Sequence, residues 1–231
     1  MFVGRSNELN EMNRLFYSNT FQLFVLYGRR RVGKTTLLTE FCRDKPSIFF
    51  SAENSTNQMN LIKFSQQIFS YFDETALEPF GSWENAFLYI EKRCGRNSLA
   101  VIIDEFPYLA ESDKSLLSVL QHLIDHRLKD SRLFLVLCGS YMGFMEREVL
   151  GSKSPIFGRR TAQLHLKTLD YYAGSELLPS ITAEEQLTYY GIFGGTPLYL
   201  SHILPDAGFE ENLKHNYFSP TGYLYEEPTL L

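Results

Sequence analysis

Near-continuous apolar runs recur along the first 166 residues of the chain. Residues 21–27, 99–103 and 133–138 are each almost entirely apolar. Such runs are typical of strands that are buried on both faces, as in a parallel sheet. Residues 47–52 and 161–166 form shorter runs, and apolar and polar positions alternate in the second. The pattern therefore predicts five strands in a mostly parallel sheet.

Helical spacing of apolar residues fills the intervals between these strands. It predicts helices over residues 6–17, 57–72, 83–94 and 114–128, and a further helix after residue 35. Ser6 is expected to be the N-cap of the first helix. Residues 106–109 are expected to lead away from the third strand, and residues 154–160 to form a loop. Alternating strands and helices predict an α/β fold.

The pattern changes from residue 169 onward, where no strand is predicted. Helices are expected over residues 170–178 and 183–193, and another begins at Leu198 after the helix-breaking sequence Gly-Gly-Thr-Pro. We therefore expect two parts, an α/β core over residues 1–168 and a small helical subdomain over residues 169–231.

Composition and charge exclude several classes of protein. The 231 residues are 44% hydrophobic and 21% charged, as in an ordinary globular chain, and the net charge of −5 gives no global bias toward nucleic acid. The three cysteines are far apart and include no Cys-x-x-Cys pair, which favours reduced thiols and a cytoplasmic location over a disulfide scaffold or zinc site. The first ten residues, MFVGRSNELN, contain no apolar h-region, so no signal peptide is expected, and no apolar stretch approaches 18 residues, so no membrane span is expected.

The strongest chemical signal is the sequence GRRRVGKT at residues 28–35, which fits the pattern G-x-x-x-x-G-K-[ST]. It lies between a predicted strand and a predicted helix, which is the context that makes this pattern a phosphate-binding loop. Loop N–H groups and the helix N-terminus then face a phosphate, Lys34 reaches the β- and γ-phosphates, and the Thr35 hydroxyl binds Mg²⁺. The candidate nucleotide-binding residues are Gly28, Arg29, Arg30, Arg31, Val32, Gly33, Lys34, Thr35 and Thr36.

Two adjacent carboxylates, Asp104 and Glu105, end the third predicted strand. Ligands of open α/β sheets bind at the carboxyl ends of the strands, so Asp104 is expected near the phosphate loop as a Mg²⁺ ligand, directly or through water. Glu105 would lie where it can polarise an attacking water. Ser140 follows the fourth strand and either hydrogen-bonds a γ-phosphate or the attacking water, or serves as an N-cap for the next segment.

Arg159 and Arg160 lie in the loop before the fifth strand. Arginine beside a transferring phosphoryl group would stabilise charge in the transition state, whereas an arginine in a loop is more often only solvated. The histidines at 122 and 126 are four residues apart on a predicted helix, but the sequence HLIDH lacks the H-E-x-x-H pattern and offers no third ligand.

Before any family is considered, a phosphate loop and a distant Asp-Glu strand with a further strand between them indicate the P-loop class typified by ATPases. The glutamate after the metal-binding aspartate favours hydrolysis over kinase chemistry. No Asn-Lys-x-Asp motif is present, which disfavours GTP. A small-metabolite kinase remains the competing enzyme class.

The chain resembles the archaeal-type ATPases of the STAND class, within the broader AAA+ and related P-loop ATPases. The resemblance is carried by six motifs in the same order: FVGR at 2–5, YGRRRVGKT at 27–35, IIDEFPYL at 102–109, CGS at 138–140, PIFGRR at 155–160 and GGTPLYL at 194–200. It implies that Val3, Gly4 and Arg5 border the adenine and that Pro197 approaches the nucleotide.

The resemblance further implies binding of ATP and Mg²⁺, a five-stranded core and a C-terminal helical lid that closes when ATP binds. Family members usually continue into winged-helix and nuclease-like segments, so the chain is expected to be truncated before them. The first functional hypothesis is an ATPase switch with catalytic residues Lys34, Glu105, Ser140, Arg159 and Arg160. The second is an ATP-regulated DNA-binding protein that acts through the missing C-terminal region. A homo-oligomer or protein partner fits either hypothesis, because the arginines could act within the chain or across an interface.

Overall fold

The computed structural model describes residues 2–75 and 78–227. The chain divides into two compact units. The core unit comprises residues 7–29 and 34–166, and the C-terminal unit comprises residues 1–6, 30–33 and 167–231. The phosphate loop is thus shared, because its residues 30–33 group with the C-terminal unit. The functional division into residues 1–168 and 169–231 stays a prediction.

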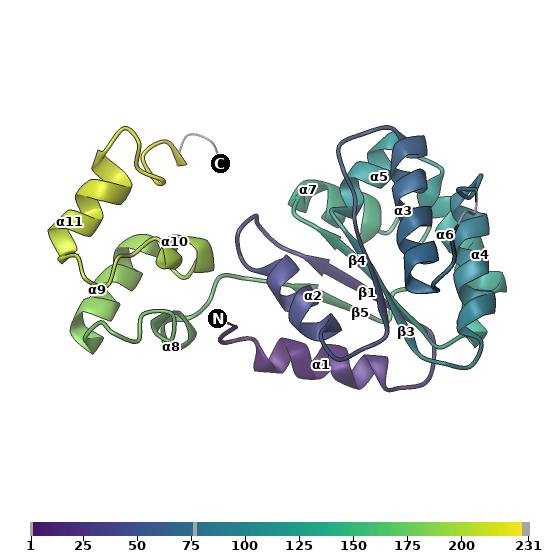
Figure 1. Ribbon diagram of the computed structural model, residues 1–231, viewed down its shortest axis with the longest axis horizontal. Helices are drawn as coiled ribbons and strands as arrows, with labels where there is room; N and C mark the ends of the chain where they lie inside the picture. Colours follow the sequence, from purple (N-terminus) through teal and green to yellow (C-terminus); the bar gives the residue numbers. More distant parts are fainter. Residues whose placement is uncertain (1, 76–77, 228–231) are drawn as a thin grey trace. The chain divides into compact units, whose positions relative to one another are not determined.

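A five-stranded sheet forms the centre of the core unit (Figure 1). Its order is β2-β3-β4-β1-β5, and all four pairings are parallel, which confirms the expected α/β fold. The strands are β1 (Gln22–Tyr27), β2 (Ser47–Ser51), β3 (Leu99–Asp104), β4 (Leu133–Gly139) and β5 (Ala162–His165). Strand β4 lies between β1 and β3 in the sheet, whereas β2, which lies between them in the sequence, is an edge strand.

The register brings the ends of the central strands to one edge of the sheet. Tyr27, the last residue of β1, is opposite Gly139, the last residue of β4, and Ile103 of β3 is opposite Leu137. Strands β1, β3 and β4 are buried along their whole length. The segments that follow these three strands therefore begin close together.

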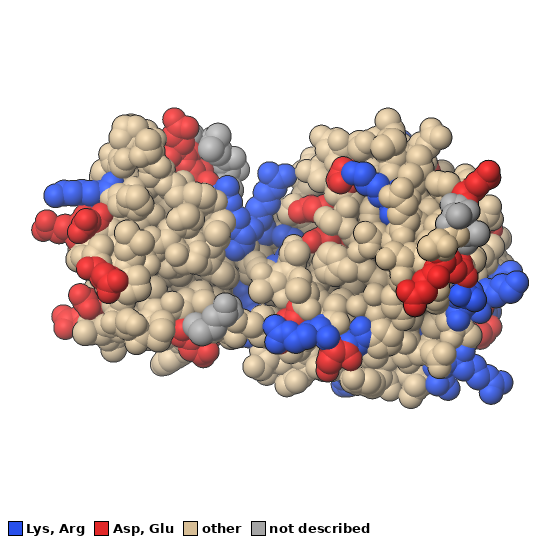
Figure 2. All heavy atoms as spheres, in the orientation of Figure 1, with Lys and Arg blue, Asp and Glu red and all other residues tan. Residues whose placement is uncertain are grey.

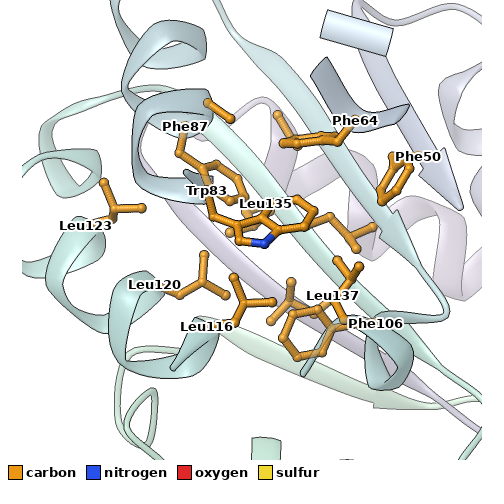
Figure 3. Close-up of a cluster of buried hydrophobic side chains, with 14 of the residues drawn as sticks. Phe50, Phe64, Trp83, Phe87, Phe106, Leu116, Leu120, Leu123, Leu135 and Leu137 are labelled. Carbon is orange, nitrogen blue, oxygen red and sulfur yellow. The ribbon is translucent and has the colours of Figure 1, made fainter. Parts of the chain in front are cut away.

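Helices cover both faces of the sheet. They are α1 (Ser6–Phe16), α2 (Lys34–Cys42), α3 (Asn57–Tyr71), α4 (Trp83–Cys94), α5 (Phe106–Ser112), α6 (Leu116–His126) and the short α7 (Met142–Phe144), with 3-10 and π turns at Leu128–Asp130 and Met145–Val149. Helices α3 to α6 pack on one face around Phe64 and Trp83 (Figure 3). On the other face, Phe16 of α1 and Phe41 of α2 pack against Phe134 of β4. Alternate residues of β4 thus supply two aromatic-rich cores, because successive strand side chains point to opposite faces.

Residues 106–112 are helical, which corrects the expectation that residues 106–109 only lead away from β3. A seven-residue helix with a proline in its first turn is too short for a clear helical period, and it is fixed by burial of Phe106, Leu109 and Ala110. The predicted helix over 114–128 is shorter, Leu116–His126, and α1 begins at Ser6 itself, so Ser6 is not its N-cap.

The C-terminal unit is helical after residue 170, as the spacing predicts. It contains α8 (Tyr171–Ser175), α9 (Ala183–Phe193), α10 (Pro197–Ser201), α11 (Phe209–Leu213) and a π turn at Lys214–Phe218. These elements enclose a core of their own, made of Leu178, Tyr189, Phe193, Leu200, Ile203 and Leu224. Helix α8 is shorter than the predicted 170–178, and α10 begins one residue before Leu198 and ends at Ser201.

Two surface properties bear on partners. Within residues 2–75 and 78–227, every helix is too short or too polar to cross a membrane. On the face shown in Figure 2, acidic and basic side chains of the described residues lie among large uncharged areas, and several basic side chains form one small group. That face therefore carries no broad area in which all charged side chains have the same sign.

Candidate functional site

The phosphate loop connects the end of β1 to the start of α2. Helix α2 begins at Lys34, so its N-terminal N–H groups directly follow the loop. The Lys34 ammonium donates hydrogen bonds to the carbonyl oxygens of Gly28 and Arg29, both at 2.9 Å, and the residue is only 6% exposed. Gly33 has a φ of 95°, a conformation that favours glycine. The loop therefore folds around the lysine that the motif assigns to phosphate.

The remaining loop residues differ in exposure. Arg29, Arg30, Thr35 and Thr36 are exposed, whereas Val32 is buried. The guanidinium groups of Arg29 and Arg30 are therefore accessible to a polyanion.

Three further contacts hold loop residues 30–33 within the C-terminal unit. Arg5 donates from Nη2 to the Val32 carbonyl at 3.2 Å. Pro197 Cγ lies 3.9 Å from where a Cβ on Gly33 would be. Arg31 forms an ion pair with Glu227. Sequence reasoning missed Glu227, and no motif or spacing connects it to the loop.

Arg5 and its neighbours hold the N-terminal segment against the start of the C-terminal unit. Arg5 also donates to the Lys167 carbonyl at 2.5 Å, and it is buried. Gly4 has a φ of 62°, and a Cβ there would lie 2.1 Å from the Cβ of Ala173. That Val3, Gly4 and Arg5 border an adenine stays a prediction, as does the approach of Pro197 to the nucleotide.

Thr35 and Asp104, the two predicted metal ligands, are in direct contact. The Thr35 hydroxyl donates to Asp104 Oδ2 at 2.8 Å, and the N–H of Glu105 donates to Oδ1 at 3.0 Å. Asp104 is 3% exposed. A hydroxyl and a carboxylate are hard oxygen ligands of the kind that Mg²⁺ prefers. The pair therefore fits a magnesium ion that also binds phosphate.

Glu105 adopts a left-handed backbone conformation, with φ 51° and ψ 41°, immediately before α5. Such a conformation costs on the order of 1 kcal/mol in a residue other than glycine and is often found at functional sites. Its carboxylate accepts a hydrogen bond from the Ser140 hydroxyl at 2.9 Å. Ser140 is not a helix N-cap, because Tyr141 occupies that position before α7. The structure thus brings these two predicted catalytic residues together.

The buried cysteine of β4 lies behind this group. Burial raises the pKa of the Cys138 thiol well above its ordinary value, and the neighbouring Asp104 carboxylate raises it further. Cys138 is therefore a neutral thiol at physiological pH, and it adds no charge beside the acidic pair.

Arg159 and Arg160 do not join these residues within the chain. They precede β5, which runs parallel to β1, and Thr161 donates its N–H to the carbonyl of Leu23 near the start of β1. The phosphate loop follows the other end of the six-residue β1, about 20 Å away at the usual rise per residue. The two arginines are thus at the opposite edge of the sheet from Lys34, and their role in catalysis stays a prediction.

Arg159 instead forms a bidentate ion pair with Asp125 of α6. Its Nε and Nη2 atoms donate to the two carboxylate oxygens, both at 2.7 Å. These hydrogen bonds hold the pKa of the Asp125 carboxyl below its ordinary value, against a smaller opposing effect of burial. Arg160 is held more loosely, by a 3.4 Å hydrogen bond to the Leu150 carbonyl and by packing over Phe157.

Replacing Arg159 by alanine is expected to lower the free energy of unfolding by about 1 kcal/mol or less, because the pair is partly exposed. Since the folded-state pKa of Asp125 is lowered, this contribution is complete above the ordinary Asp pKa of about 3.9 and is lost as pH falls through the lowered value. Urea unfolding at pH 7, 5 and 3 measures it. Arg160→Ala is the matched control, and a wild-type advantage already lost at pH 5 would contradict the assignment to Asp125.

Comparisons with known proteins show the family and the fold of the chain. Residues 2–203 match the family model of an ATPase domain predominantly from Archaea. An uncharacterised protein of Methanocaldococcus jannaschii, MJECL04, is 32% identical over 203 residues, which are 88% of this chain and 44% of that protein. The chain thus spans less than half the length of this curated relative.

Solved structures show the same fold. The Walker-type ATPase PABY2304 of Pyrococcus abyssi has a TM-score of 0.67 and 22% identity, covering 92% of this chain and 71% of that chain. A STAND protein with a tetratricopeptide repeat sensor from Pyrococcus horikoshii has a TM-score of 0.54 and 19% identity, covering 92% of this chain and 32% of that chain. The family match over most of the chain and the P-loop fold lead to one conclusion: the chain belongs to the family of P-loop ATPase domains found predominantly in Archaea.

Proposed function

We propose that this protein binds Mg-ATP, hydrolyses it to ADP and phosphate, and acts as a nucleotide switch of the STAND type. The observation that carries the proposal is the 2.8 Å contact between Thr35 of the phosphate loop and Asp104 of β3. It joins the phosphate-binding element to the acidic strand end in the arrangement that phosphoryl-transfer sites of P-loop proteins use.

Each core-unit residue has a distinct role in this proposal. Lys34 neutralises the β- and γ-phosphates once it exchanges its loop carbonyl partners for phosphate oxygens. Thr35 and Asp104 would hold Mg²⁺, which supplies neutralisation of phosphate charge when bound. The N–H groups of the loop and of the start of α2 orient the phosphate chain.

Glu105 is proposed to accept a proton from the attacking water. Its carboxylate lies beside Ser140 at the same sheet edge as Asp104, and the hydrogen bond from Ser140 fixes its orientation. A water that donates to Glu105 would be aligned for attack on the terminal phosphorus. A glutamate in this position favours transfer to water over transfer to a metabolite hydroxyl.

Arg159 and Arg160 are proposed to act in catalysis across an interface. This proposal is supported by their position at the opposite edge of the sheet from the phosphate loop, and a second copy of the chain could receive them. Substitution of either residue should then lower turnover only under conditions in which the protein self-associates.

The compartment proposed is the cytoplasm, since Cys42, Cys94 and Cys138 are free thiols.

Phosphate release from Mg-ATP, measured with and without duplex DNA at low salt, tests the proposal. Release of inorganic phosphate that requires Mg²⁺ is the expected result, with a slow rate in the isolated chain. Turnover that rises steeply with DNA, and falls with salt, would favour the DNA-regulated alternative. Transfer of phosphate to an added metabolite without release to water would refute the ATPase assignment.

A further inference from the structure

The side chain of Arg31, at the tip of the phosphate loop, is enclosed by residues from the far end of the C-terminal unit. Its guanidinium forms an ion pair with Glu227 and lies over the ring of Tyr223, 5.1 Å from the centroid. Tyr199 of α10 donates its hydroxyl to Glu227 Oε1 at 2.6 Å. Arg31 is therefore held by a carboxylate and an aromatic ring, and that carboxylate is itself held by a second side chain.

The residues that surround the Arg31 guanidinium are themselves held in place by further contacts. Glu227 is only 6% exposed, and a buried carboxylate is costly unless it is paired and hydrogen-bonded. Tyr223 is fixed from behind by the imidazole of His202, which stacks on it at 4.2 Å and 15°. Arg31 itself has a left-handed backbone, with φ 71°, and its side chain is 32% exposed. The contact thus connects a strained position of the loop to a carboxylate that needs a cation.

We propose that Glu227 sets the nucleotide affinity of the phosphate loop by acting through Arg31, and that it lowers this affinity. The inference rests on the proposed binding of ATP. Glu227 neutralises one of the three consecutive arginines of the loop and places a negative charge beside the element that receives a triphosphate. Like charges near a phosphate disfavour its binding, and the effect persists where the charge is shielded from solvent.

The effect of the Glu227–Arg31 pair on ATP binding is reciprocal. If Glu227 weakens ATP binding, bound ATP must weaken the Glu227–Arg31 pair by the same factor. Segment 223–227 then responds to the occupancy of the phosphate loop, and anything that draws this segment away from Arg31 raises the affinity for nucleotide. Glu227 is a positioning residue in this scheme, because it acts through Arg31 and does not touch the nucleotide.

The first test compares the Kd for Mg-ATP of the wild type, Glu227→Gln and Glu226→Gln by fluorescence titration. Glutamine keeps the shape of Glu227 and an oxygen for the Tyr199 hydroxyl, while it removes the charge. We expect Glu227→Gln to bind ATP on the order of tenfold more tightly, with a smaller gain at high salt. Glu226→Gln removes the same charge one position away, on an exposed side chain, and should change Kd less than about twofold.

The second test is a double-mutant cycle with Arg31→Gln. In the Arg31→Gln background, Glu227→Gln should increase the affinity for ATP by less than about threefold. The reason is that the charge of Glu227 can no longer act through the Arg31 guanidinium. A gain of equal size in both backgrounds would overturn the role of Arg31. An equal or weaker affinity of Glu227→Gln, in a wild type that binds ATP, would overturn the inference and leave the proposed function intact. A folded wild type that does not bind ATP refutes both.

A third measurement uses only the wild type, in case Glu227→Gln does not fold. Hydrogen exchange of the amides in segment 223–227 should become faster when ATP is added at saturation, since nucleotide binding weakens the contact with Arg31. Slower exchange in this segment on ATP addition would show that nucleotide strengthens the contact, and it would overturn the inference.

Discussion

Replacing Lys34 by alanine is expected to weaken ATP binding at least about 100-fold while the fold persists. Lys34 is the buried cation of the phosphate loop, and its ammonium lies within the loop, 2.9 Å from the carbonyl oxygens of Gly28 and Arg29. Arg29 and Arg30 cannot replace it, because their side chains are exposed to solvent, whereas the Lys34 ammonium is buried within the loop. Titration with Mg-ATP measures the loss directly.

The matched control for this variant is Lys63→Ala. Lys63 is a partly exposed lysine whose side chain is 40% accessible and pairs with Glu53 in the core unit, so its removal should leave both ATP affinity and fold nearly unchanged. Circular dichroism and a thermal melt establish that Lys34→Ala is folded. Equal ATP affinity in the wild type and in folded Lys34→Ala protein would refute nucleotide binding at the phosphate loop.

Replacing Glu105 by glutamine is expected to leave ATP binding nearly unchanged and to slow hydrolysis by about 100- to 10,000-fold. Glutamine can still accept the 2.9 Å hydrogen bond from Ser140, and it fits the same backbone conformation. It cannot accept a proton from water. The variant therefore removes the proposed base while it preserves the geometry around it, and single-turnover phosphate release reports the chemical step.

Glu111→Gln controls for the change in net charge, because Glu111 is exposed on the neighbouring helix α5. We expect it to hydrolyse ATP at the wild-type rate. An unchanged rate in Glu105→Gln would remove Glu105 from the role of base and would leave water activation to another group. A loss of ATP binding in Glu105→Gln would instead assign the residue to nucleotide or metal binding.

The sequence by itself determined the elements whose signals are local. Runs of apolar residues defined the positions of β1, β3 and β4, since a strand buried on both faces must be apolar throughout. The glycine and lysine spacing defined the phosphate loop, because backbone conformation and phosphate contacts depend on adjacent residues. Thr35 and Asp104 could be paired in advance, because parallel strands and the loop after β1 end at one edge.

Only the tertiary structure decided where the two arginines lie. Arg159 and Arg160 carry a sequence signal for phosphate chemistry, yet the parallel direction of β5 places them at the edge away from the loop, where Asp125 of α6 binds Arg159. The ion-pair partner of Arg31 could not be predicted from the sequence either, since Glu227 lies far along the chain from the phosphate loop. An ion pair between such distant residues leaves no period or spacing in the sequence, because it depends on how separately folded segments meet.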